Sequence, residues 1–529
     1  MKRSHWLISA CGLMLATVAA APAGDIYVDG SNASGTELGT QQSPFRKVQS
    51  AIDAAAGGDR IRVAAGTYVE NLRIDSKAII LEGGYSGAWV RDTAANPTTL
   101  SSAGGNAVIN LIAADATIDG FRITGGTGST EEVPYGYHGG GIYSRDGSPT
   151  ISNNIIENND VRKNDAASDY NYGGGAYVTN ATTVTIMNNV VRGNSAGRGA
   201  GIAVFGQEAH ILGNTIESTI AIGDHGGGMF IGVVNATVSQ NIIRRNEVGR
   251  DLGYGWGGGL IVVNKGNSAE LSFNTVYENF AAAFGSGEFV DEGAHADIHH
   301  ELIYGNLSKA ECESISAIYI DGGEGVGSTA TISFCTIVGN ICENSTRGNG
   351  LQVEGKSVVS VTNSIFWDNG GDDFAVFDTS SINATFVCSE EAIAGTGNIS
   401  DDPRFVNASA NDYHLGAGSP CIDAGDPASP FNFEPADNGG RADMGRYGNA
   451  TDAPSAAELS DSGTGSGGGS GDNSQPATDE TAPPSNDSVS SAGLCPTASA
   501  MLLSISLIGV GRSRRSRSDS AKRDAADAV

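Results

Sequence analysis

Positive charge is scarce in this sequence of 529 residues. Its 31 Lys and Arg residues stand against 60 Asp and Glu residues, which gives a net charge of −29 and a pI near 4.5. Such a chain repels nucleic acids and anionic membrane surfaces. We therefore expect no nucleic-acid partner. No cofactor is certain; calcium, bound by Asp and Asn oxygens of turns, is compatible with the acidity, but no site for it can be localised.

Aromatic residues make up only 7% of the chain, whereas glycine occurs 75 times. Few bulky side chains and much glycine argue against large helical cores and indicate many turns and close backbone approaches. The composition favours a turn-rich β fold.

The C-terminus lacks a hydrophobic run of full membrane-spanning length. The apolar run 498–511 has roughly 14 residues, fewer than the ~20 that span a bilayer comfortably. It follows Gly-Leu-Cys-Pro at 493–496 and precedes four arginines between 512 and 517. This order resembles the C-terminal sorting signals of Gram-negative bacteria, after which a protease cleaves and anchors the protein; a plain tail anchor is the alternative. We expect membrane contact only through residues 493–529.

The N-terminus predicts export. Lys2 and Arg3 precede an apolar stretch from Trp6 to Ala20, and small residues continue to Ala23, the order found in secretory signal peptides. We expect removal of residues 1–23, a folded body at 24–450, and a disordered Gly/Ser/Asp/Pro linker at 451–492. Export and sorting machinery would then place the protein outside the cell or on the surface of a Gram-negative-type bacterium, with outer-membrane anchoring as one outcome.

Cysteine is rare, with seven in the chain, of which Cys11 and Cys495 fall in the two terminal signals. An oxidising envelope permits disulfides among the other five. The candidates for pairing are Cys312 with Cys342 and Cys388 with Cys421, which leaves Cys335 unpaired and buried. Connectivity does not follow from sequence, so these pairs remain hypotheses.

One short unit recurs along the chain, as in SNNIIENN, MNNVVRGN, SQNIIRRN and SFNTVYEN. Asparagine at a fixed turn position tolerates the left-handed backbone conformation and can bond to its counterpart in the next repeat, so we expect two stacked, stabilising ladders. The first column contains Asn154, Asn189, Asn214, Asn241 and Asn274, followed by Glu301, Cys335 and Ser364. The second contains Asn159, Asn194, Asn246, Asn279, Asn306, Asn340 and Asn369, with Thr219 standing in once.

A Gly-rich motif such as HGGGIY at 138 or WGGGLI at 256 runs in step with the Asn units. Repeats of 25 to 35 residues divide naturally into three short strands and three turns. The sequence therefore predicts an all-β solenoid with three parallel strands per coil and about ten coils between Ala51 and Ser389. A short helix at Val48–Gly58 would cap its N-terminal end.

These repeats resemble the pectin-lyase-like superfamily of right-handed parallel β-helices. The segments IYVDGSNASGTELGTQQSPFRKVQSAID and GNISDDPRFVNASANDYHLGAGSPCIDAGDP extend the similarity over roughly Asp25 to Tyr447. The resemblance implies a right-handed helix and a polysaccharide or cell-surface ligand. It does not fix an activity, because the superfamily includes lyases, polygalacturonases and adhesins.

The residues before the Gly-rich copies should project from equivalent turns of coils that lie about 4.8 Å apart. This column contains His138, Tyr172, Arg198, His225, Trp256 and Phe284. Loops of variable length precede it, as they often do beside binding grooves. The predicted ligand-binding residues are His138, Tyr172, Asp224, Tyr254 and Trp256. Alternatively, these side chains only cover the turns and stabilise adjacent coils.

Two functions remain open. A monomeric, surface-displayed protein that binds polysaccharide or mediates adhesion needs no catalytic groups, and we expect this function first. A lyase acting on uronate polymers needs a base, a cation for the carboxylate and an acid, which His225, Tyr172 and Arg198 could supply. Whether the protein is an enzyme is therefore uncertain.

Hydrolysis and metal chemistry are less favoured. The acidic pairs Asp291-Glu292, Asp372-Asp373 and Asp401-Asp402 are sequence neighbours that would point to opposite faces of a strand, so we interpret them as solvated turns. His295, His299 and His300 lack a further ligand at a spacing that defines a zinc site.

Overall fold

The structure, a computed structural model, describes residues 23–131, 136–163, 170–309, 316–323, 325–342, 350–434 and 439–451. The chain divides into a unit that ends at Ser460 and a second unit from Asp461 to Val529, and all described residues belong to the first. The expected signal peptide up to residue 22, the linker from residue 452 and the tail lie outside them. Within these ranges, no helix is long and apolar enough to cross a membrane.

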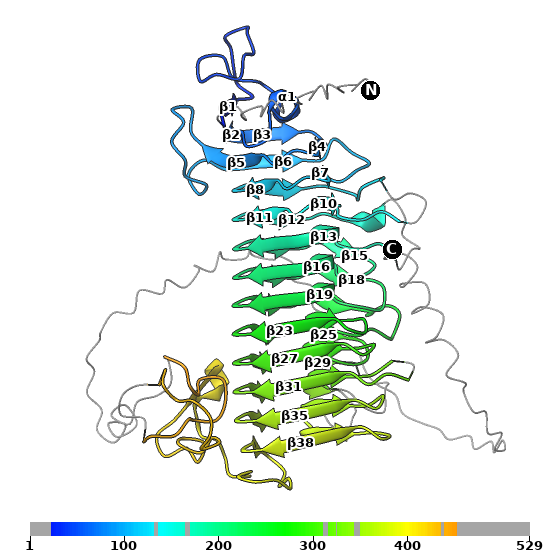
Figure 1. Ribbon diagram of the computed structural model, residues 1–529, viewed down its shortest axis with the longest axis vertical. Helices are drawn as coiled ribbons and strands as arrows, with labels where there is room; N and C mark the ends of the chain where they lie inside the picture. Colours follow the sequence, from blue (N-terminus) through cyan, green and yellow to red (C-terminus); the bar gives the residue numbers. More distant parts are fainter. Residues whose placement is uncertain are drawn as a thin grey trace, which may run out of the picture. The chain divides into compact units, whose positions relative to one another are not determined.

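Short parallel strands stack coil upon coil in this first unit (Figure 1). Each coil passes in turn through three faces, which we number 1 to 3 in chain order. Face 2 is a 12-stranded sheet that takes one strand from each coil, so twelve coils are described, more than the approximately ten expected. The last coil, residues 381–389, lies within the predicted range but carries no ladder asparagine, so no repeat unit marks it in the sequence.

Faces 1 and 3 together form one 21-stranded sheet, because three long strands bend from face 3 of one coil into face 1 of the next. These long strands are β13 (Ala176–Met187), β16 (Ile202–Leu212) and β19 (Met229–Ser239). Face 1 otherwise contains β1 (Asp25–Val28), β2 (Arg60–Ala64), β5 (Ile80–Tyr85), β8 (Thr117–Asp119), β11 (Thr150–Ser152), β23 (Ser268–Ser272), β27 (His295–His299), β31 (Thr329–Ser333), β35 (Val358–Thr362) and β38 (Ser381–Thr385). Face 3 otherwise contains β4 (Leu72–Asp75), β7 (Ile109–Ile112), β10 (Ile142–Arg145), β22 (Leu260–Val262), β26 (Glu288–Val290), β30 (Ile318–Ile320), β34 (Leu351–Val353) and β37 (Phe374–Val376).

Face 2 contains β3 (Gly66–Val69), β6 (Thr98–Ser101), β9 (Arg122–Thr124), β12 (Ile155–Glu157), β14 (Val190–Arg192), β17 (Thr215–Glu217), β20 (Ile242–Arg244), β24 (Thr275–Tyr277), β28 (Leu302–Tyr304), β32 (Thr336–Val338), β36 (Ile365–Trp367) and β39 (Cys388–Ser389). A six-stranded sheet of two-residue strands follows it in the middle coils: β15 (Ser195–Ala196), β18 (Ile220–Ala221), β21 (Glu247–Val248), β25 (Phe280–Ala281), β29 (Leu307–Ser308) and β33 (Ile341–Cys342). The three faces agree with the coil predicted from repeat length, and six middle coils add a fourth, two-residue strand.

Inward-pointing aliphatic side chains fill the solenoid, because alternate residues of each strand face the interior. On face 1 one such column is in register through the coils and fully buried: Ile61, Leu81, Ile118, Ile151, Ile186, Ile211, Val238, Leu271, Ile298 and Ile332. Helix α1 (Val48–Ala54) buries Val48, Ala51 and Ile52 against the first coil, which confirms the predicted N-terminal cap.

Both asparagine ladders are present. Asn154, for example, donates its backbone N–H and its Nδ2 to Oδ1 of Asn189, at 2.9 and 3.1 Å, and a second Nδ2 bond reaches the Ile118 carbonyl at 2.9 Å. One expectation was misplaced: the left-handed conformation belongs to the residue before each ladder position, such as Asn153 or Gln240, and not to the ladder asparagine. The ladder side chains are buried and hold neighbouring coils together.

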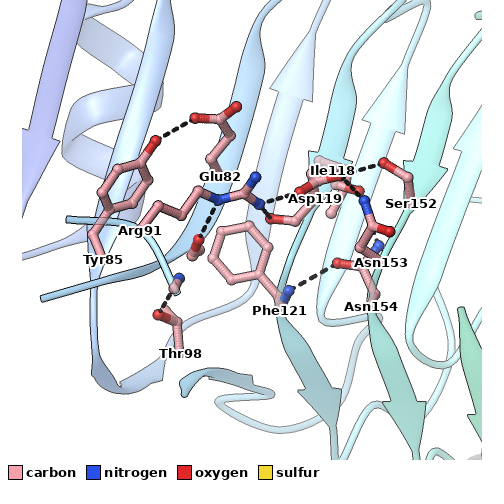
Figure 2. A network of polar contacts seen from close by, with 12 residues as sticks. Glu82, Tyr85, Arg91, Thr98, Ile118, Asp119, Phe121, Ser152, Asn153 and Asn154 are labelled. Carbon is pink, nitrogen blue, oxygen red and sulfur yellow. Dashed lines mark hydrogen bonds and ion pairs between the residues drawn. The ribbon is translucent and has the colours of Figure 1, made fainter. Parts of the chain in front are cut away.

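The coils before the first ladder are fastened differently. The loop 86–97 lies beside face 1, and its Arg91 pairs with Asp119 on β8 while donating from Nε to the Gly83 carbonyl at 3.0 Å (Figure 2). Asp119 also accepts bonds from Ser152 Oγ at 2.5 Å and Asn153 Nδ2 at 2.6 Å on the next coil. This ion-paired network joins three coils where the ladder is absent.

The described part of the chain after residue 389 doubles back along the solenoid. It contains the antiparallel strands β40 (Phe405–Asn407) and β41 (Asp412–Leu415), with the short 3-10 turn η2 (Ala408–Ala410) between them. A second 3-10 turn, η1 (Val161–Lys163), lies within the solenoid. Tyr413 of β41 packs on Leu302 and Val338 of face 2. The Gly448 carbonyl lies 3.0 Å from His300 Nε2. We call residues 390–451 the C-terminal strap.

Candidate ligand-binding site

The residues before the Gly-rich copies do form the predicted column. Backbone N–H groups of Gly139, Gly173, Gly199, Gly226 and Gly257 donate to the carbonyls of Tyr172, Arg198, His225, Trp256 and Phe284, at 2.9 to 3.2 Å. Each of these glycines has a positive φ of 53° to 70°, which explains the first glycine of the motif. The column therefore runs coil by coil beside face 3.

Arg198 is buried, with 1% of its surface exposed. Its Nε and Nη2 bond to the two carboxylate oxygens of Asp224 at 2.7 and 3.1 Å, and its Nη1 donates to Tyr172 Oη at 3.0 Å. The guanidinium also lies over the ring of Tyr170, 4.8 Å from its centroid. A cation that is already bidentately paired and excluded from solvent is badly placed to neutralise a substrate carboxylate, which argues against the lyase role considered for Arg198.

Asp224 joins Arg198 to His225. His225 Nδ1 lies 2.7 Å from Asp224 Oδ1, an ion-pair distance without good hydrogen-bond geometry. Burial disfavours the carboxylate, but the charges of His225 and Arg198 outweigh it and hold the pKa of Asp224 well below its usual range. Asp224 therefore stays ionised and acts as the counter-ion of the column.

His138 and Tyr172 are structural neighbours rather than accessible groups. His138 is buried and stacks on Tyr177 at 4.7 Å, and its Nδ1 accepts the Tyr172 N–H at 3.0 Å. Burial lowers the pKa of His138 to about 4, so its ring is neutral near pH 7. For both residues the alternative interpretation, packing over the turns, describes the structure better than ligand binding.

Tyr254 and Trp256 form the accessible part of the predicted site. Tyr254 is 44% exposed, Trp256 is half-buried, and their ring centroids are 5.8 Å apart. The Trp256 ring lies 5.1 Å from His225, which is itself partly exposed. We call Tyr254, Trp256 and His225 the aromatic platform.

Sequence reasoning missed an inner aromatic layer beneath the column. The outward positions of face 3 are buried and apolar, and they form one cluster with Tyr172: Tyr143, Tyr177, Ala203, Phe230, Ile261, Phe289 and Tyr319. The signal was visible as the second residue after each glycine triplet, where Ile-Tyr, Met-Phe or Leu-Ile places an apolar group on both sides of the strand. This layer supports the platform from below.

The other candidate groups have structural surroundings. Asp373, expected in a solvated turn, is instead buried and accepts bonds from Asn369 Nδ2 at 2.8 Å and the Glu390 N–H at 2.9 Å. Burial raises the pKa of Asp373 to about 7. Asp291 is likewise shielded, and its burial, with Asp321 nearby, raises its pKa well above the usual range. Asp401-Asp402 lies on the surface, as expected.

The three histidines are held by different partners. His295 Nδ1 contacts Thr329 Oγ1 at 2.8 Å and His299 Nε2 contacts Glu270 at 3.3 Å, whereas His300 stacks between Phe273 and Phe334. Across the described ranges, no group of three or more His, Cys, Asp or Glu side chains could hold a metal ion.

The cysteine hypotheses have different outcomes. Cys312 and the side chain of Cys342 lie outside the described residues. Cys335, Cys388 and Cys421 are buried free thiols. The unpaired, buried state expected of Cys335 agrees with this, and Cys388 and Cys421 share one apolar cluster.

Comparison with known proteins bears on the fold. Residues 52–284 match the family model described as a right handed beta helix region. This chain contains a right-handed parallel β-helix. No curated protein sequence matches it significantly.

Two solved structures are similar to this β-helix. One is the crystal structure of pectate lyase Pel9A, at 12% identity and a TM-score of 0.41, covering 80% of this chain and 96% of that one. The other is XylC in complex with xylose, at 9% identity and a TM-score of 0.38, covering 72% and 87%. Likenesses this distant carry no information about the activity of the β-helix.

Proposed function

We propose that this β-helix is an exported, surface-displayed protein that binds polysaccharide without cleaving it, through the aromatic platform. The observation that supports the proposal is the exposed Tyr254 ring set against Trp256 on a rigid solenoid. Flat aromatic faces suit the apolar faces of sugar rings, and a solenoid offers a continuous lateral surface for a long polymer.

The charges beside the platform favour a neutral polymer over a uronate. Arg198 is committed to Asp224, and Arg250 is paired with Glu247 at 2.6 Å while lying over the Phe280 ring at 3.9 Å. Asp251 is exposed nearby in the same loop as Tyr254. An anionic polymer would meet net negative charge here, which costs binding energy.

Binding can be measured by affinity electrophoresis of the exported protein in gels that contain neutral glucans, xylans or galactans, with pectate and alginate gels in parallel. We expect retardation in at least one neutral gel, and Trp256→Ala and Tyr254→Ala each to weaken it about tenfold, the scale of one lost ring contact. Phe433→Ala is the matched control, because Phe433 is an exposed aromatic residue on the C-terminal strap. Unchanged retardation in both platform variants would contradict the proposal.

A lyase remains the second candidate because the Asp224 and His225 side chains approach within 2.7 Å beside Trp256, where the partly exposed imidazole could act as a base in its neutral form. Incubation with pectate, alginate and other uronate polymers, with and without calcium, would release unsaturated products that absorb in the ultraviolet. We expect no product. Product that disappears in His225→Ala and persists in His210→Ala, an exposed histidine on β16, would establish the lyase instead.

A further inference from the structure

The last coil and the C-terminal strap each contribute one cysteine to the same buried cluster. Cys388 lies on β39, and Cys421 lies in the strap just beyond β41. Both are fully buried and pack with Ile365, Leu415 and Met444. Two thiols from segments far apart in sequence thus meet in one apolar pocket.

The two thiols lie in one buried apolar cluster, and each is held by further bonds. A hydrogen bond between the two thiols, followed by burial, raises the pKa of Cys421 well above its usual value. Cys388 Sγ also lies 3.4 Å from the Asp401 carbonyl, and Ser419 Oγ accepts the Cys421 N–H at 3.2 Å. The Cys388 N–H also donates to the Ser364 carbonyl at 3.0 Å, so the backbone of both cysteines is held within the shared cluster.

A cross-link at this point would strengthen the attachment of the strap to the solenoid. The strap's described contacts with the penultimate coil are partly apolar, through Leu415 and Met444 in the cluster of Ile365. Others are polar, such as Asn363 Nδ2 to Ser429 Oγ at 2.7 Å and the Asp426 N–H to Asn363 Oδ1 at 2.6 Å. Polar contacts of this kind open more readily than an apolar core, because water can replace each partner. The chain beyond the strap continues toward residues 452–529, so any pull from that side acts on the strap first.

We propose that Cys388 and Cys421 form a disulfide that staples the C-terminal strap to the last coil of the β-helix. The two thiols lose two protons and two electrons to a disulfide oxidant, which is reduced to its dithiol, and one S–S bond forms. Because both sulfurs are buried, exchange takes place while the strap is folding or transiently open. Cys335 sits in the ladder column, 3.3 Å from the Ser333 carbonyl and away from this pair, and stays reduced.

Peptide mapping can identify the bond directly. The full chain is produced in an oxidising compartment, denatured with an alkylating agent and no reductant, and digested with trypsin. Cleavage after Lys356, Arg404 and Arg441 places Cys388 in peptide 357–404 and Cys421 in peptide 405–441. We expect these two peptides as one linked species that separates on reduction. Separately alkylated peptides, or a link from either one to peptide 310–347, which carries Cys312, Cys335 and Cys342, would overturn the proposal.

A second measurement tests what the bond does. Limited proteolysis of the strap should accelerate at least tenfold when wild-type protein is reduced, since a cross-link removes open conformations from the unfolded segment. The Cys388→Ser/Cys421→Ser variant should be cleaved fast with or without reductant, whereas Cys335→Ser should keep the reductant sensitivity of the wild type. Equal cleavage of reduced and oxidised wild-type protein would refute the staple.

Discussion

Two ladders run side by side through the β-helix, yet they end differently. The second continues as asparagine from Asn159 to Asn369, with Thr219 as its one exception, and finishes on the buried carboxyl of Asp373. The first is asparagine only as far as Asn274 and then continues with Glu301, Cys335 and Ser364. Both ladders pass through the same coils, so coil geometry alone does not explain the change.

The first ladder changes its residue type in the coils that the C-terminal strap contacts. Glu301 is buried beside Glu288, which occupies an inward position of face 3 that is Leu260 in the preceding coil and Ile318 in the next. Burial, reinforced by the charge of Glu301, raises the pKa of Glu288 well above the usual range, and burial raises the pKa of Glu301. On the outside of the same coils, Arg446 of the strap bonds to the His300 carbonyl. The regular ladder thus belongs to coils that are exposed at this corner, and the altered one to coils that the strap covers.

The largest expected effect comes from breaking the regular ladder. In Asn246→Ala, the Ile216 carbonyl and the Thr219 N–H both lose a buried partner, and Asn279 Oδ1 loses its Nδ2 bond. Unpaired buried polar groups cost about 1–3 kcal/mol each, so we expect a loss of about 4 kcal/mol in the free energy of unfolding. Denaturant titration measures it, with the exposed Asn235→Ala on β19 as the control. Equal stability of the two variants would mean that the ladder is not the main tie between coils.

Replacing Glu288 and Glu301 with the residues of the neighbouring coils should remove a pH dependence of the free energy of unfolding. Because the folded-state pKa of Glu288 is raised, the folded chain keeps a proton that the unfolded chain releases above about pH 4.5. The free energy of unfolding then falls by about 1.4 kcal/mol per pH unit until the folded-state pKa is reached. Glu288→Leu/Glu301→Asn, which copies the neighbouring coils, should be more stable than wild type at pH 8 and similar to it near pH 4.

The same denaturation series, run from pH 4 to 9, checks this prediction. Glu278→Gln/Glu217→Gln serves as the control, since both of these glutamates lie on the outside of the coils. A double variant that loses stability above pH 5 as steeply as the wild type would show that another buried group holds the proton.

The acid side of the profile should depend on His300. Burial first, and then the charge of His299, lower the pKa of His300 to about 4. The unfolded chain takes up a proton below about pH 6.5 while the folded one does not, so stability is lost as the pH falls from 6.5 toward 4. His300→Phe, which continues the stack of Phe273 and Phe334, should abolish about 2 kcal/mol of that loss. His210→Phe, at an exposed position, should leave the slope unchanged.

The sequence predicts the regular parts of this molecule and fails where partners come from distant coils. Periodicity alone placed both ladders, the column before the glycines and the capping helix. It put the left-handed residue one position late, because asparagine is common at both neighbouring positions. The last coil lies within the predicted range, but it has Val387 where the ladder unit would have an asparagine, so no repeat unit marks it.

Burial of charge was the harder problem. Nothing in the local sequence shows that Arg198 and Asp224, 26 residues apart, neutralise each other inside the column. Asp373 was taken for a solvated turn because the strap that covers it follows later in the chain. Tyr254 and Trp256 remain as predicted candidates, since their accessibility depends only on the loop that carries them.

The smallest expected change in stability concerns the outward side chains of face 2. Here too, the exposed coils differ from the coils that the strap covers. Glu157 accepts bonds from Arg122 and from Arg192, the latter at 2.8 Å, whereas further along the column Tyr277 and Tyr304 stack at 4.8 Å and Tyr304 meets Tyr413 of the strap. Burial opposes ionisation of Glu157, but the two arginines lower its pKa.

Arg192 is about half exposed and Glu157 keeps Arg122, so Arg192→Ala should cost only about 0.5 kcal/mol, and 1 M salt should screen most of that. Thermal unfolding at low and high salt measures the difference, and Arg245→Ala, whose pair with Glu278 is more exposed, is the matched control. A salt-insensitive loss of 2 kcal/mol or more, the scale of an uncompensated buried charge, would show that the exposed coils depend on their ion pairs as the covered coils depend on the strap.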